Sequence, residues 1–238
     1  PLTSAADNDR KKQNKNLNMA GSFGWEIIKH LTLKTEFGYD YYTLYDKRFF
    51  GLTSYQARNY ADQAFDNDVR ESFRNTNTIN YDFKSLFKTK DHSLNMLLGH
   101  EYIITKEHEN INQVVGFPKT YDAATAWRLS SQGTASATSD FYYPDDKLLS
   151  FFTRANYSYK DKYLASATFR ADASSKFSKG NRWGYFPSAA LAWRITSEKF
   201  MNGTRKWLDD LKLRFSLGTA GNNNIASGQL IQEYMPYE

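Results

Sequence analysis

The chain has 238 residues, which suits one all-β domain or two small domains. It contains no cysteine, so disulfide bonds and zinc–thiolate sites are excluded. The formal net charge of +5 is spread along the chain rather than gathered in a patch, which argues against nucleic-acid binding. The mean hydropathy of -0.70 is compatible with a membrane β-barrel, because the strands of such a barrel alternate polar and apolar residues.

Apolar and polar side chains alternate with a period of two in most of the chain. Between Tyr163 and Asp172, the odd positions carry Tyr, Ala, Ala, Phe and Ala, and most even positions are polar. Successive side chains of a strand point to opposite faces, so such a segment has one apolar and one polar face. In chain order this pattern predicts about eight strands: 16–28, 31–45, 78–84, 93–104, 149–160, 163–172, 185–195 and 211–217.

The connections between the predicted strands alternate between short and long. Transmembrane β-barrels show this asymmetry, because their periplasmic turns are short and their extracellular loops are long. A tilted strand needs roughly 9 to 11 residues to cross the hydrocarbon layer, and the predicted strands are of that order. We therefore expect an all-β fold, an antiparallel transmembrane β-barrel segment with short periplasmic turns and long extracellular loops. The short links are 29–30, 88–92 and 160–162, the long ones are 46–70 and 108–147, 174–184 is of medium length, and the last link is 197–210.

Residue patterns typical of enzymes and metal sites are missing from the sequence. The four histidines, His30, His92, His100 and His108, do not have the spacing of a metal-binding motif. Neighbouring carboxylates such as Asp209 and Asp210 would point to opposite faces of an extended segment, which disfavours a concerted acid–base pair. We therefore predict no catalytic residue, no metal site and no cofactor.

Two runs in the last third of the chain form a specific signature. The first consists of RADASSKF (170–177), NRWGYFPS (181–188), AWRI (192–195) and EKFM (198–201), and the second of LDDLKLR (208–214) and GTAGN (218–222). Together they resemble the barrel of the SusC/RagA-type TonB-dependent outer-membrane receptors of Bacteroidetes. Ala173 stands where that family usually has glycine. The first half of the chain resembles the family in architecture alone.

The resemblance implies that the chain contributes to TonB-dependent uptake of nutrients, either oligosaccharides or peptides, across the bacterial outer membrane. It also implies several partners: a SusD-like surface lipoprotein, the TonB complex acting on a plug domain, and outer-membrane lipid. No plug domain or TonB box is recognised in the sequence, and family barrels have 22 strands. We therefore expect residues 1–238 to be one part of a larger barrel domain.

Two sets of side chains are candidates for contacts within such a receptor. The polar stripe would face the barrel interior, where charged groups need partners from a plug or a substrate. Aromatic rings on the long loops could stack on sugars or peptides. The interior set is Arg154, Arg170, Asp172, Arg194 and Arg214, and the loop set is Tyr55, Tyr60, Phe65, Phe117, Tyr121 and Trp127.

Two alternatives make different structural demands. A passive porin or small closed barrel requires the first and last strands to pair with each other. A soluble β-rich carbohydrate-binding or adhesion module requires the apolar stripe of Leu149, Phe151, Ala155 and Tyr157 to be buried against a second sheet.

Overall fold

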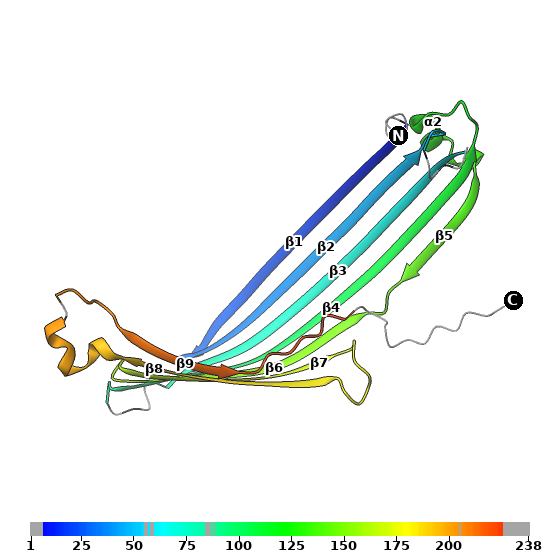
Figure 1. Ribbon diagram of the computed structural model, residues 1–238. Coiled ribbons are helices and arrows are strands. Elements are labelled where there is room, and N and C mark those ends of the chain that lie inside the picture. Colours follow the sequence, from blue (N-terminus) through cyan, green and yellow to red (C-terminus); the bar gives the residue numbers. More distant parts are fainter. Residues whose placement is uncertain are drawn as a thin grey trace. The chain divides into compact units, whose positions relative to one another are not determined.

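A computed structural model describes residues 7–54, 57, 60–83, 87, 89–204 and 206–225. These residues form a nine-stranded antiparallel sheet in which most strands pair with the next one along the chain (Figure 1). The order is β1-β2-β3-β4-β6-β7-β8-β9, and β5 lies off this path, paired with β4. The strands are β1 (Asn8–Ile28), β2 (Leu31–Phe50), β3 (Ala61–Asp82), β4 (His92–Phe117), β5 (Thr134–Tyr142), β6 (Asp146–Tyr159), β7 (Tyr163–Ser174), β8 (Trp183–Arg194) and β9 (Lys212–Gly218).

The chain divides into two compact units, and the long strands β1 to β4 contribute residues to both. The first unit contains Pro1–Met19, Tyr39–Ser72 and Thr105–Asp145. The second contains Ala20–Gly38, Phe73–Ile104 and Asp146–Glu238. In the described residues, the helical elements are α2 (Ala123–Arg128) and a few short 3-10 turns, none of which is long and apolar enough to span a membrane.

In the second unit, the strand register sorts the side chains onto two faces. Side chains directly opposite each other in an antiparallel pair lie on the same face. Phe151 lies opposite Ala171, which lies opposite Tyr185, and the alternate row joins Asn156 to Ser166. One face is therefore apolar and the other polar, as the period-two pattern predicts.

The apolar face of the second unit is open rather than buried. The relative exposures of its large side chains lie between 37% and 73%. A soluble protein would bury such an apolar surface, whereas in a membrane lipid can cover it. The alternative of a soluble module is contradicted on this point, because Phe151 and Tyr157 are exposed rather than packed under a second sheet. The exposed residues are Phe151, Tyr157, Tyr163, Phe169, Trp183, Tyr185, Leu191, Leu213, Phe215 and Leu217.

The small closed barrel is contradicted as well. Within the described strands, β1 and β9 are the two ends of the sheet order and do not pair with each other. Each leaves an edge whose backbone groups are free to pair with further strands.

The strands of the first unit are longer than the sequence pattern indicated. Segments 46–70 and 108–147, expected to be loops, include the end of β2, the start of β3, the end of β4 and all of β5. The expected extent of these two loops was therefore wrong. The reason is that polar residues occupy both faces here, as at Asp62, Gln63, Asp66 and Asp68, so the period-two signal is lost although the backbone still pairs.

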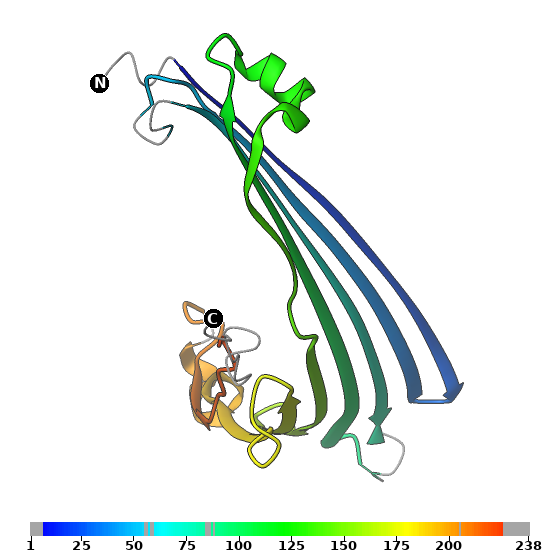
Figure 2. The same cartoon turned by 90° about the vertical axis from the view of Figure 1, so that its right-hand side faces the viewer.

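A small hydrophobic core lies in the first unit. It comprises Phe49, Ala61, Phe117 and Ala126, and Tyr121 packs against it. Helix α2 supplies Ala126 and lies beyond the ends of β4 and β5 (Figure 2). The connection between these two strands is therefore a folded cap over the strand ends.

The turn between β6 and β7 shows how local chemistry sets the register. Lys160 and Asp161 have φ of 53° and 54°, and the amide of Lys162 donates to the carbonyl oxygen of Tyr159 at 3.0 Å. Two successive positive φ angles define a type I′ turn, whose twist matches that of the flanking strands. Lys162 follows as one further residue of the connection, and Tyr159 lies opposite Tyr163.

Candidate functional site

The polar face of β6 to β9 carries all five charged residues that the sequence placed on the interior stripe. Arg154 lies opposite Thr168, and Arg170 lies opposite Phe152. Arg214 lies opposite Ala192. Alternation along the strands then places the remaining two on the same face. The full set is Arg154, Arg170, Asp172, Arg194 and Arg214.

Arg170 is the centre of a hydrogen-bonded network in this face. Its Nε donates to both carboxylate oxygens of Asp172, at 2.7 and 3.0 Å. One of its Nη atoms donates to Glu101 Oε1 at 3.0 Å and to Ser150 Oγ at 2.9 Å, and Ser150 is fully buried. Glu101 also accepts from Thr76 Oγ1 at 3.1 Å. The network therefore links β3, β4, β6 and β7 and is a structural part of the wall.

Arg194 occupies the end of β8 beside the connection to β9. Its Nε lies 3.6 Å from Asp210 Oδ1, the same oxygen that accepts a hydrogen bond from Thr196 Oγ1 at 3.1 Å. Asp210 thus faces both a cation and a hydroxyl. This arrangement ties the connection to the strand end.

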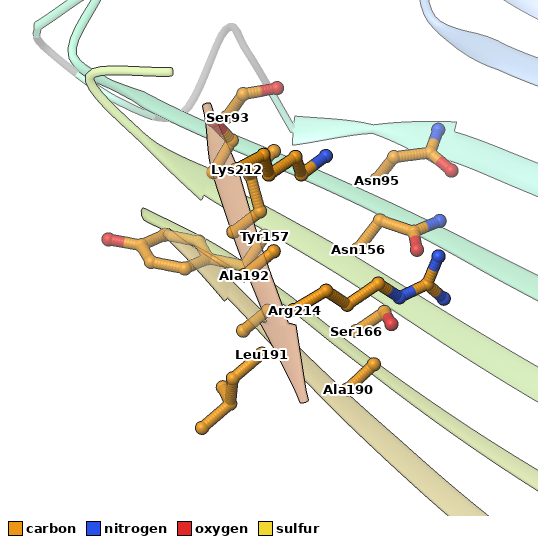
Figure 3. Close-up of a pocket in the computed structure, with 13 residues that line it drawn as sticks. Ser93, Asn95, Asn156, Tyr157, Ser166, Ala190, Leu191, Ala192, Lys212 and Arg214 are labelled. Atoms are coloured by element: carbon orange, nitrogen blue, oxygen red, sulfur yellow. The ribbon is translucent and has the colours of Figure 1, made fainter. Parts of the chain in front are cut away.

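Arg154 and Arg214 differ from Arg170 and Arg194, because neither forms an ion pair in the described part of the chain. Two adjoining hollows on the polar face share Arg214, Asn156, Ser166 and Ala190, and Arg154 lines the second of them. The first hollow has a volume of about 270 Å³. Figure 3 shows the side chains of Asn156, Ser166 and Arg214 on one side of the sheet, with Tyr157 and Leu191 on the other.

The first hollow combines cationic, polar and apolar groups. Beside Lys212 and Arg214 it is lined by amides, hydroxyls, alanines and the larger side chains of Tyr157, Leu164 and Leu191, and the described residues that line it include no carboxylate. Such a surface can bind anionic groups and hydrogen-bond acceptors. Across the described chain, no group of three or more His, Asp or Glu side chains could hold a metal ion.

The loop aromatics fall into different environments. Tyr55 lies outside the described residues, whereas Tyr60 is exposed. Trp127 lies beneath the ammonium group of Lys47, 4.7 Å from the ring centroid. Phe65 is paired edge-on with Tyr45 at 4.7 Å within the strands.

The position of Phe117 differs from the one expected from the sequence. It was expected to be an exposed loop aromatic, yet it ends β4 and is 1% exposed. It belongs to the hydrophobic core beneath α2 and is unavailable to a ligand, while Tyr121 stacks on its ring at 6.3 Å. The sequence alone could not distinguish an exposed loop aromatic from a core aromatic at a strand end, because both place an aromatic ring beside a turn.

The two signature runs come together around one aromatic ring. A Cβ atom added to Gly184 would lie 2.6 Å from the ring of Phe186, and one added to Gly221 would lie 2.2 Å from it. The absence of side chains at these glycines lets the ring pack between them. A cavity of about 310 Å³ beside the ring is also lined by Asp172 and Asn222. The signature therefore encodes the docking of segment 218–222 on β8.

Glu198 fastens the connection between β8 and β9 to the strand ends. Its carboxylate accepts from Lys162 Nζ at 2.9 Å, from Tyr163 Oη at 2.7 Å and from Trp193 Nε1 at 3.2 Å. These donors, led by Lys162, lower the pKa of Glu198 to about 2. All three stabilise the ionised form.

Glu198→Gln should release this connection. The folded-state pKa lies below the ordinary value of 4.5, so the carboxylate contributes stability above pH 4.5 that is lost as the pH falls towards about 2. We expect pepsin to cleave within 195–211 increasingly over this range in the wild type, with rates normalised to an unstructured peptide. The Glu198→Gln variant should be cleaved readily already at the upper end of the range. Equal pH profiles for the two proteins would contradict this role.

Comparisons with known proteins agree on one family. The chain is 27% identical over 234 residues to TonB-dependent receptor P3 of Formosa agariphila, covering 98% of this chain and 22% of that relative. It is 49% identical over 84 residues to TonB-dependent receptor SusC of Bacteroides thetaiotaomicron, covering 35% of this chain and 8% of that relative. The chain thus spans about a fifth or less of these relatives, and no family model matches it.

Solved structures give the same result for the fold. The structure of the RagAB peptide transporter aligns with a TM-score of 0.80 at 28% identity, covering 93% of this chain and 24% of that chain. The RagAB importer in its "open-open" state aligns with a TM-score of 0.81 at 27% identity. By sequence and by fold, the chain is a partial segment of the SusC/RagA type of TonB-dependent receptor, a group of outer-membrane β-barrel proteins.

Proposed function

We propose that residues 1–238 form part of the barrel wall of a receptor that imports oligosaccharides or peptides across the outer membrane. The observation that carries this proposal is the two-faced sheet. It has an exposed apolar face suited to lipid and a polar face bearing unpaired arginines suited to a protein-filled interior. The relatives support it, since they are TonB-dependent receptors and one solved neighbour is a peptide transporter.

The partners follow from the same family relationship. In this proposal a SusD-like surface lipoprotein caps the receptor, and TonB acts through a plug domain encoded outside residues 1–238. Arg154 and Arg214 then contact acidic groups of the plug or of the substrate, because cations on an enclosed interior wall need partners. Arg170 and Asp172 serve the wall itself, since they already satisfy each other.

Uptake by cells tests the proposal. A strain that lacks the receptor gene should lose growth on one class of nutrient, either oligosaccharides or peptides, when that class is the sole source. The intact gene should restore growth, and a protonophore that dissipates the energy for TonB should abolish uptake. Growth that is unaffected by the deletion on every substrate of both classes would overturn the proposal.

Replacing residues 119–132 by a short Gly/Asn turn tests the role of the cap in binding substrate. Val115 pairs with Thr134, so β4 and β5 can still be joined after the replacement. The change removes Tyr121 and Trp127, and we expect uptake to fall about tenfold or more, because buried aromatic contacts dominate recognition. Receptor abundance in the outer membrane should persist.

A matched control keeps this segment and changes Arg128 and Ser130 to alanine. It should retain the uptake rate, because neither side chain is one of the aromatic rings. Normal uptake by the loop replacement itself would show that ligand contacts lie elsewhere.

A further inference from the structure

The connection between β8 and β9 exposes two large aromatic side chains. Phe200 is 67% exposed and Trp207 is 74% exposed, which makes Trp207 the most exposed of the large hydrophobic side chains in the described chain. Two lysines, Lys199 and Lys206, lie next to them in sequence. Rings flanked by cations are typical of segments that lie at a membrane surface.

These rings are held on an ordered segment. The 3-10 turns η4 (Ile195–Ser197) and η5 (Lys199–Thr204) follow β8 directly. The Phe200 ring packs edge-on against Trp193 at 6.5 Å, and the amide of Trp207 donates to the carbonyl oxygen of Thr204 at 3.1 Å. The exposure of the rings is therefore a feature of the fold.

The segment continues the apolar face of the second unit past the strand ends. Trp193 and Tyr163 lie opposite each other on that face, and Glu198 binds both side chains. Figure 1 shows the segment, in orange, at the ends of β8 and β9. In an outer-membrane protein this position coincides with the boundary between hydrocarbon and headgroups, where Trp and Tyr are enriched.

The charges of the segment favour an anionic partner. Glu198 is engaged by Lys162, and Asp210 is engaged by Thr196 and faces Arg194. Among the described residues, no ion pair joins Lys199 or Lys206 to a carboxylate. Asp209 is the remaining exposed acid of the segment, and the sequence also places Arg205 beside Lys206, so the cations of the connection outnumber this anion.

We propose that residues 195–204 and 206–208 bind anionic phospholipid in the leaflet that faces the periplasm. Phe200 and Trp207 insert at the level of the upper acyl chains, and Lys199 and Lys206 contact lipid phosphates. The segment anchors the end of the β8–β9 hairpin to the bilayer surface. This role rests on the membrane location of the barrel and does not depend on what the receptor transports.

Quenching of Trp207 fluorescence tests the proposal in the full receptor reconstituted into vesicles. The signal is the emission of the wild type minus that of Trp207→Phe. We expect brominated acyl chains to quench it. Brominated phosphatidylglycerol should quench at least about twofold more strongly than brominated phosphatidylcholine at equal fraction, because each lysine adds attraction to anionic headgroups.

Lysine variants separate the two parts of the proposal. The double change Lys199→Gln and Lys206→Gln should weaken the preference for phosphatidylglycerol and leave the quenching itself. Lys119→Gln, in the connection between β4 and β5, is the matched control and should keep the preference. A Trp207 signal that no brominated lipid quenches would overturn the proposal, as would a preference that the double change leaves undiminished.

Two further controls address misfolding and the choice of fluorophore. Heat-modifiable migration of the barrel on gels shows whether each variant is folded. Phe200→Trp in the Trp207→Phe background moves the fluorophore to the other ring, which should also be quenched. A folded receptor in which neither position is quenched would place the segment in water.

Discussion

Replacing Arg170 by alanine is expected to lower the free energy of unfolding of the receptor barrel by about 2–4 kcal/mol. The side chain donates to Asp172, Glu101 and Ser150, and the two acids are only 22% and 18% exposed. Removing the guanidinium leaves these carboxylates without their cation in a partly desolvated wall. Arg170→Lys should recover a fraction of the loss, because an ammonium group cannot bridge three acceptors in the same fixed geometry.

Urea unfolding of the reconstituted receptor measures this effect, with heat-modifiable migration as an independent readout. Arg128→Ala is the control. It changes an exposed arginine outside the network that forms no ion pair within the described residues, and we expect a shift within about 0.5 kcal/mol. Similar losses for the two arginines would show that the network around Arg170 contributes no specific stability.

Gly99→Ala should destabilise the same wall by about 1–3 kcal/mol through overpacking. A Cβ atom at Gly99 would lie 2.2 Å from two ring atoms of Phe152, far inside van der Waals contact. The ring cannot move freely, because the guanidinium of Arg170 lies over it at 5.6 Å from its centroid. The added methyl group therefore strains the junction between β4 and β6.

A double-mutant cycle with Phe152→Leu separates this steric effect from a change in strand propensity. The smaller side chain opens the space above Gly99, so the double variant should be more stable than the sum of the single changes predicts, by about 1 kcal/mol. Additive losses would mean that the cost arises in the backbone. Gly21→Ala is a suitable control, because nothing lies within 4 Å of the added atom.

The sequence predicted the fold well wherever one side of the sheet is apolar. The turns at 29–30 and 160–162, the two-faced strands β6 to β8 and the shared face of the five charged residues all follow from alternation. Alternation is informative there because lipid demands an unbroken apolar stripe. Where polar residues occupy both faces, as at Asp62 and Gln63, pairing continues without that demand and the pattern in the sequence is lost.

The candidate site was less predictable, because partners arise from register between distant strands. The sequence placed Arg170 on the interior stripe, but it did not show that Glu101 lies within 3.0 Å of it, on a strand 69 residues earlier in the chain. Glu198 was visible only as part of a signature. Whether Phe117 faces solvent or a core depended on α2, whose six residues are too few to show a helical period.

The pairing of β4 with β6 has a consequence for the order in which the sheet assembles. Every other neighbour pair on the path of the sheet joins strands that are consecutive in the described chain, so each can close across its own connecting segment. Joining β4 to β6 instead requires the chain to travel through α2 and β5, and the entropy cost of closing a loop rises with its length. Folding of β5 back onto β4 shortens that loop before β6 arrives. The β4–β5 hairpin should therefore form early, and its loss should slow the insertion of β6 to β9 more than it weakens the finished sheet.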